Sequence, residues 1–63
     1  MNLKEIRTAK KLTMQEVSAG VEITESYYSL IENNKRRPSV DVAKRLARYF
    51  GFDWTLFFDG ESA

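Results

Sequence analysis

The sequence contains neither cysteine nor histidine among its 63 residues. Their absence excludes disulfide bonds, thiolate and imidazole metal ligands, and the usual nucleophile and base pairs of enzymes. Only three glycines are present, and they form no glycine-rich phosphate loop. No pair of carboxylates has a spacing that indicates an acid-base site. We therefore predict a non-enzymatic protein with no cofactor and no bound metal.

Long hydrophobic runs are also missing. No stretch approaches the length of a membrane span, and the first residues, Met1-Asn2-Leu3-Lys4-Glu5, lack the apolar region of a signal peptide. We expect a cytoplasmic protein with no membrane partner and no small-molecule ligand. A chain of this size buries only about 60% of the surface that its unfolded form exposes, so its single small core leaves little stability in reserve.

The residues that are present indicate helices. Apolar residues recur at intervals of three and four, and no alternating strand pattern occurs, so we predict an all-α domain. The pattern and its capping residues divide the chain into five helices, at about 3–11, 13–21, 24–33, 40–50 and 54–58. The predicted N-caps of these helices are Asn2, Thr13, Thr24, Ser39 and Asp53.

Helix stops follow the same logic. Asn33-Asn34 ends the third helix, because asparagine tolerates the left-handed conformation, and Gly51 ends the fourth. Pro38 keeps Arg37 out of helical geometry. Asp59-Gly60 ends the last helix, so we assign residues 1–60 to one domain and 61–63 to a loose tail.

The order of elements between Leu12 and Pro38 predicts a helix-turn-helix, in which the second helix of the motif enters the major groove of DNA. Its buried positions are expected to include Val17, Tyr28 and Ile31. The net charge of the chain is only +1. Attraction for phosphates must therefore come from local clusters of cations, above all residues 33–37, Asn-Asn-Lys-Arg-Arg, which we call the basic turn.

Double-stranded DNA is the partner that this layout predicts. Residues on the outward side of the recognition helix are expected to contact bases, and those candidates are Glu25, Ser26, Tyr27 and Leu30. Cations, small polar side chains and helix starts are expected to contact phosphates. The phosphate candidates are Gln15, Thr24, Ser29, Asn33, Lys35, Arg36 and Arg37.

The chain resembles the Xre/Cro/phage-repressor family of helix-turn-helix proteins, from about residue 3 to residue 60. The resemblance is carried by Leu12-Thr13, Val17, Val21, Ile23-Thr24, Ser29-x-Ile31-Glu32-Asn33, Lys35-Arg36-Arg37-Pro38-Ser39, Leu46-Ala47 and Phe50-Gly51-Phe52. It implies a compact five-helix domain of the lambda-repressor type and a function in transcription regulation, as a repressor that binds two DNA half-sites as a homodimer.

The resemblance also implies a structural pair and a dimer contact. An arginine of the first helix commonly pairs with the glutamate that ends the recognition helix, and Arg7 and Glu32 occupy these positions. In the last helix Trp54, Phe57 and Phe58 are expected to close the core. Leu56 falls on the other side, where with the edge of Trp54 it is a candidate dimer contact.

The chain departs from this family at four positions. Met14 replaces a glutamine that helps to hold a phosphate. Glu22 replaces a turn glycine of positive φ, at a cost on the order of 1 kcal/mol unless Gly20 ends the helix early. Glu25 and Leu30 replace polar or basic base-contacting residues. Glutamate accepts from the cytosine amino group and leucine contacts the thymine methyl group. The same two residues favour the alternative of an antitoxin-like or regulator-binding protein-interaction module of the same fold.

Overall fold

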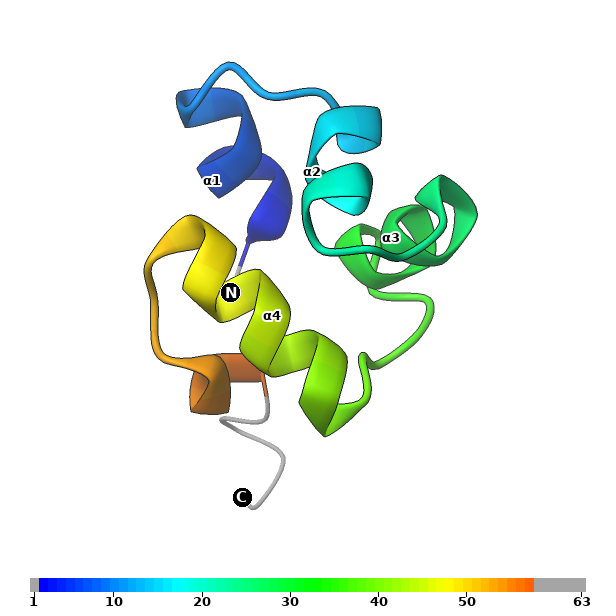
Figure 1. Ribbon diagram of the computed structural model, residues 1–63, viewed down its shortest axis with the longest axis vertical. Coiled ribbons are helices and arrows are strands. Elements are labelled where there is room, and N and C mark those ends of the chain that lie inside the picture. The colour runs from blue at the N-terminus through cyan, green and yellow to red at the C-terminus, as the bar shows by residue number, and fades with distance from the viewer. Residues whose placement is uncertain (1, 58–63) are drawn as a thin grey trace.

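The computed structural model describes residues 2–57. These residues form four α-helices and one short 3-10 helix (Figure 1). The elements are α1 (Leu3–Ala9), α2 (Met14–Gly20), α3 (Glu25–Glu32), α4 (Val40–Phe50) and the 3-10 helix η1 (Trp54–Phe57). The prediction of an all-α domain is confirmed. None of the helices in this part of the chain is long and apolar enough to cross a membrane.

The core lies where α2, α3 and α4 meet. Val17, Tyr28 and Leu46, one residue from each of these helices, are the largest side chains with no exposed surface. Leu3 of α1 closes the same cluster and is only 4% exposed. In Figure 1, α4 passes below the other three helices and supports them. The two helices of the helix-turn-helix thus pack against α4 through the shared core.

The helix starts agree with the sequence. Asn2, Thr13, Thr24 and Ser39 each accept a hydrogen bond on the side chain from the backbone N–H three residues further on. At α2 the capping box is complete, since the Glu16 carboxylate also accepts from the Thr13 N–H at 2.9 Å. These bonds satisfy backbone groups that have no partner within the helix.

Each of the four α-helices is followed within two residues by one in the left-handed conformation, and only one of these residues is glycine. The φ angles are 58° at Lys11, 62° at Glu22, 59° at Asn34 and 87° at Gly51. After each of them the next N–H bonds back to the carbonyl five residues earlier, as Ile23 does to Ser18 at 3.0 Å. This is the Schellman arrangement. Glu22 therefore does adopt the positive φ expected at the turn position, although α2 already ends at Gly20.

Two helix predictions need correction. The first helix ends at Ala9 and not near residue 11, because Lys10 is its C-cap and Lys11 is left-handed. The predicted fifth α-helix is the 3-10 helix η1, so the domain has four α-helices and not five. A segment this short gains little from the α-helical hydrogen-bond pattern, and i to i+3 bonding is common in such connectors.

Aromatic packing positions η1 on the domain. The rings of Phe57 and Phe52 lie at a tilt of 57° with centroids 5.5 Å apart, and both pack against the buried core from a half-buried position. Trp54 is also half-buried, and the Lys44 ammonium lies 5.1 Å above its ring centroid. Trp54 therefore covers α4 from outside. The expected core role of Phe58, the helix stop at Asp59-Gly60 and the loose tail 61–63 lie outside the described residues.

Candidate nucleic-acid interface

Helix α3 has one buried side and one exposed side. Tyr28 and Ile31 face the core with 0% and 4% exposure, whereas Leu30 is 40% exposed. Glu25 and Ser26 are exposed as well. These outward residues begin at the N-terminal end of the helix, which is the end that contacts base edges when such a helix enters the major groove.

A shallow depression runs along this exposed side, and α2 forms its other wall. It is lined by Met14, Glu25, Ser26, Ser29 and Leu30, and we call it the α2–α3 depression. Met14 is half-buried and packs against the core. Its place in the wall of the depression was missed, because nothing in the local pattern shows which residues of α3 stand opposite.

Glu25 has no ion-pair partner among residues 2–57. It lies in the first turn of α3, where the positive end of the helix dipole favours a carboxylate. Its side chain is exposed within the depression. The surface beside α3 therefore carries an acceptor-only group next to apolar Leu30.

Tyr27 is half-buried and not simply outward. Its hydroxyl accepts a hydrogen bond from the Ser39 N–H at 3.3 Å, and the Arg36 guanidinium lies 5.5 Å from its ring centroid. Through these contacts Tyr27 connects α3 to the basic turn and to the start of α4. The sequence pattern missed this role, since Ser39 is 12 residues away along the chain.

The basic turn is fixed at its start by the end of α3. The Leu30 carbonyl accepts from the Lys35 N–H at 2.8 Å and from the Arg36 N–H at 3.2 Å. Further on, the side chain of Pro38 is buried. The turn therefore leaves α3 in one defined direction, although its side chains are exposed.

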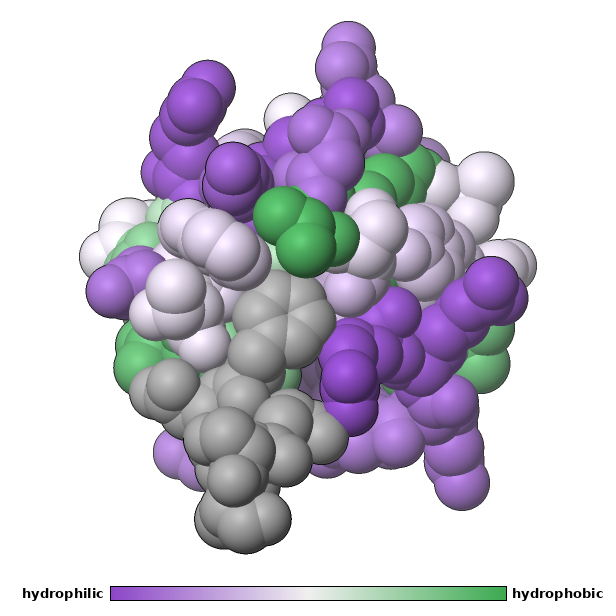
Figure 2. Space-filling model, turned by 90° about the horizontal axis from the view of Figure 1, so that it is seen from below, coloured by the Kyte–Doolittle hydropathy of each residue, from purple (hydrophilic) through white to green (hydrophobic). Residues whose placement is uncertain are grey.

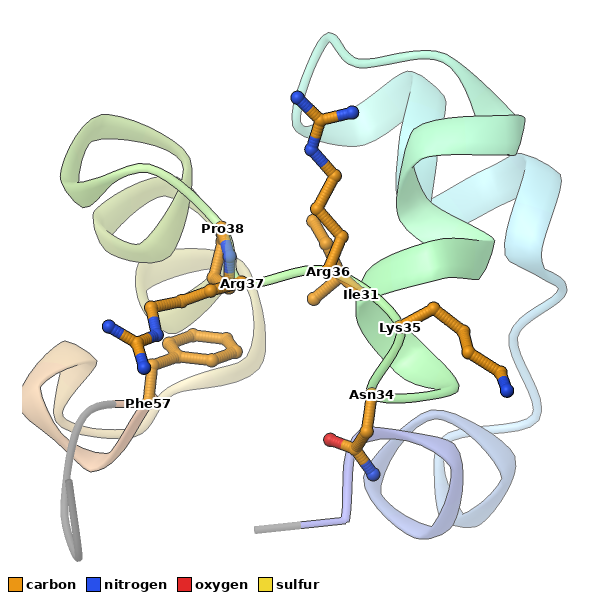
Figure 3. A pocket seen from close by; sticks show the side chains of 7 residues that line it. All are labelled: Ile31, Asn34, Lys35, Arg36, Arg37, Pro38 and Phe57. Atoms are coloured by element: carbon orange, nitrogen blue, oxygen red, sulfur yellow. The ribbon is translucent and has the colours of Figure 1, made fainter.

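The three cations of the turn diverge. Figure 3 shows Lys35, Arg36 and Arg37 pointing away from one another around a cavity of about 320 Å³, with Arg37 extending toward Phe57. Only Arg36 extends back along the side of α3, where it covers Tyr27. No carboxylate within residues 2–57 forms an ion pair with Lys35 or Arg36. The charges of these two residues are thus available to an external anion.

The other phosphate candidates are exposed or half-exposed polar groups around α3. Gln15 is exposed in the first turn of α2. The Thr24 hydroxyl is occupied as an N-cap and accepts from the Tyr27 N–H at 3.1 Å. The Asn33 side-chain amide donates to the Ser29 carbonyl at 2.9 Å. Three of these groups, those of Thr24, Ser29 and Asn33, already have hydrogen-bond partners within α3 or at its C-cap.

At the far end of α3, Arg7 and Glu32 form an ion pair. Arg7 Nε lies 2.7 Å from Glu32 Oε1, and the side chains are 12% and 4% exposed. A second bond joins Arg7 Nη2 to Glu32 Oε2 at 3.2 Å, and Arg7 Nη1 donates to the Leu12 carbonyl at 2.8 Å. The Tyr28 hydroxyl donates to Glu32 Oε1 at 3.0 Å. The fork of Arg7 therefore joins α1, α3 and the start of the helix-turn-helix.

The protonation states of this network follow from its geometry. Burial opposes ionisation of Glu32, but the hydrogen bonds from Arg7 and Tyr28 outweigh it and lower the Glu32 pKa below its ordinary value. Burial and the bond to Glu32 together raise the pKa of Tyr28. Glu32 is therefore a carboxylate and Tyr28 a neutral donor at neutral pH.

The two dimer candidates lie on η1. Leu56 is 42% exposed, and Trp54 is half-buried below Lys44. Where described residues are visible in the view from below in Figure 2, hydrophobic residues form separate spots among hydrophilic ones. Such a surface offers small apolar contacts and not a broad apolar interface.

The family model for helix-turn-helix proteins matches residues 3–57. The chain belongs to this family. It is similar to a Bacillus subtilis (strain 168) protein named "Uncharacterized HTH-type transcriptional regulator YqaF", with 46% identity over 57 residues that cover 90% of this chain and 75% of the relative. No solved structure matches the chain. Family membership confirms the interpretation of the sequence as a non-enzymatic helix-turn-helix domain of Cro/C1/Xre type.

Proposed function

We propose that this protein is a small transcriptional regulator that binds a specific double-stranded DNA sequence through α3. The observation that carries the proposal is the position of the outward side of α3, between the first turn of α2 and two cations of the basic turn, Lys35 and Arg36, that form no ion pair within residues 2–57. A helix flanked by phosphate-binding groups on both sides matches the requirements of the major groove. Membership of the family, and the name of the Bacillus relative, support the same function.

Bases and phosphates are contacted by different groups in this proposal. Glu25, Ser26 and Leu30 contact base edges, and the Tyr27 ring reaches the groove only along its exposed edge. Phosphate contacts come from the cations of the basic turn and from polar groups around α3, namely Gln15, Thr24, Ser29, Asn33, Lys35, Arg36 and Arg37. The ion pair of Arg7 and Glu32 contacts no DNA and holds α3 in place.

The protein acts as a homodimeric repressor in this proposal. One domain with a net charge of +1 and few phosphate contacts binds weakly, whereas two domains on half-sites about 34 Å apart double the contacts. Leu56 and the edge of Trp54 are the proposed dimer contact. Because apolar residues on that face are scattered, we expect a weak dimer that DNA binding strengthens.

The decisive test is a titration of the protein with duplex DNA at several salt concentrations. Fluorescence anisotropy should show affinity that falls steeply between about 50 and 200 mM salt, because each neutralised phosphate releases counterions. Absence of salt-dependent binding to any duplex would contradict the proposal. A selection of bound sequences from a random pool then gives the half-site, its spacing and its symmetry in one experiment.

A protein-interaction module of the same fold is the second candidate. The exposed Leu30 favours it together with Glu25, which forms no ion pair among residues 2–57, because an apolar group and an acid in one depression suit a protein partner as well as a base. In that case the salt titration shows no duplex binding. The two candidates are therefore separated by one measurement.

A further inference from the structure

The α2–α3 depression contains an apolar pair that comes from two different helices. Met14 stands in the first turn of α2 and Leu30 in the last turn of α3, and both line the depression. Leu30 is 40% exposed, and the half-buried side chain of Met14 packs against the hydrophobic core. Two apolar side chains on either wall of an open depression cannot satisfy the polar edge of a base. They suit an apolar group that enters between them.

The polar group of the same depression restricts its occupant further. Glu25 is an acceptor-only group without an ion pair in the described part of the chain. In the major groove guanine presents two acceptors, N7 and O6, while cytosine and adenine present amino donors. A guanine edge opposite Glu25 would bring acceptors together and leave the carboxylate desolvated without a donor. The Glu25 carboxylate therefore disfavours guanine at the position that it faces, whereas the hydroxyls of Ser26 and Ser29, which also line the depression, both donate and accept.

Only one apolar group is displayed in the major groove, the C5-methyl group of thymine. We infer that Met14 and Leu30 together form a thymine-methyl site, so that each half-site carries a thymine at this position with a cytosine or adenine, and not a guanine, facing Glu25. This inference rests on the proposed DNA binding and names the sequence chemistry that it prefers. The inference gives Met14, in the wall of the depression, a role in sequence specificity.

The backbone around Leu30 makes the site testable by mutation. The bonds that fix the basic turn end on the carbonyl of Leu30, so truncation of its side chain leaves them in place. Leu30→Ala therefore removes half of the apolar pair without displacing Lys35 or Arg36. Val40 is a matched control, since it is another exposed apolar residue, 51% exposed, and lies outside the depression.

The experiment starts from duplexes selected by the wild-type protein out of a random pool. Each thymine of the half-site is replaced in turn by uracil, which removes the methyl group and keeps the pairing. At one position we expect the affinity of the wild type to fall about fourfold, the effect of withdrawing one methyl group from a buried apolar contact. Leu30→Ala and Met14→Gln should bind the thymine and uracil duplexes equally well. Val40→Ala should behave as the wild type, and thermal melting verifies that each variant is folded.

Three results would overturn the inference. If uracil at every position leaves the affinity unchanged, the thymine-methyl site is contradicted although DNA binding itself stands. A loss on uracil substitution that persists unchanged in Leu30→Ala would assign the effect to DNA shape and not to this pair. Guanine selected throughout the half-site would contradict the role of Glu25. If no duplex is bound at any salt concentration, the proposed function fails as well, and the two failures are thus distinguishable.

Discussion

Two glutamates on α3 have opposite environments. Glu32 is 4% exposed in its side chain and is held by Arg7 and by the Tyr28 hydroxyl. Glu25 lies about two helical turns earlier, on the same side of the helix by periodicity, yet it is exposed and has no ion pair in the described residues. The position of a glutamate on the surface of α3 therefore does not determine whether its carboxylate is buried and paired. That depends on whether a neighbouring helix covers it.

The covering helix is α1. Its Arg7 reaches the C-terminal end of α3 and forms the pair with Glu32. Figure 3 shows α1 next to that end of α3, beside Asn34. The N-terminal end has no such cover, so Glu25 stays available to a partner. Glu32 is thus used for stability, whereas Glu25 is left for recognition, and variants around the two glutamates should separate these roles.

The largest effect is expected from Arg7→Ala. Removal of the arginine leaves Glu32 buried without its counter-ion, which typically costs about 3 to 5 kcal/mol of unfolding free energy. Urea unfolding followed by circular dichroism measures the change. Glu25→Ala is the matched control at the exposed end and should stay within about 0.5 kcal/mol of the wild type. Equal losses at both ends would break the comparison.

Tyr28→Phe is expected to have the next largest effect. The substitution keeps the buried ring and removes only the hydroxyl that donates to Glu32, and a hydrogen bond to a charged group is worth about 1.5 to 3 kcal/mol. The same unfolding experiment tests it. Tyr27→Phe, which removes a hydroxyl from a half-buried ring with a 3.3 Å bond, serves as the control and should cost less. An unchanged stability of Tyr28→Phe would show that Arg7 alone neutralises Glu32.

Acid should weaken the fold through Glu32. Its pKa is lower in the folded state than its ordinary value of 4.5, so its contribution is fully present above the unfolded-state pKa and is lost as the pH falls through the folded-state pKa. The free energy of unfolding of the wild type should therefore decrease below about pH 4.5, measured in urea at a series of pH values. Glu32→Gln should show a smaller decrease over this range. An identical pH profile would place the acid sensitivity elsewhere.

Lys35→Ala tests the basic turn through DNA binding and not through stability. Its side chain forms no ion pair in the described residues, so the melting temperature should stay nearly unchanged. Affinity for all duplexes should fall together, and the slope of log K against log salt should become shallower by about 0.9 for each protomer. Arg48→Ala removes the same charge from the exposed side of α4 and should leave binding unaltered. Selective loss of one DNA sequence would contradict the phosphate role.

Glu25→Gln is expected to produce the smallest change. It removes a negative charge beside the DNA, so binding to duplexes of unrelated sequence should strengthen by roughly 0.5 kcal/mol, the scale of exposed charge interactions. Glutamine also recognises adenine with two hydrogen bonds, so a repeated selection should shift from cytosine toward adenine at the facing position. An unaltered selection would show that Glu25 faces no base.

Much of the fold was predictable, because its signals are local. The caps at Asn2, Thr13, Thr24 and Ser39 each act over three residues, and all four were found from the sequence. The helix ends were harder. Glycine at position 51 predicts the left-handed conformation, because glycine adopts it easily. Lys11 adopts the same conformation, with φ of 58°, although a lysine side chain disfavours it.

Less of the candidate site was predictable. The outward position of Leu30 follows from helical periodicity, and its exposure agrees with that prediction. The contact of Arg7 with Glu32 was expected from the resemblance to a family, since no local pattern links residues 25 positions apart. The hydrogen bond of Tyr27 to Ser39 was not expected at all.

The sequence by itself determined the helices, their starts and the chemistry that α3 carries, because these depend on hydrogen bonds and apolar spacing within a few residues. Tertiary structure alone decided that Glu32 is covered by α1 while Glu25 is not, and that Met14 and Leu30 line the same depression. It also shortened the last helix to η1. The physical reason is that burial and electrostatic partners depend on which helices pack together, and that packing is a property of the whole core.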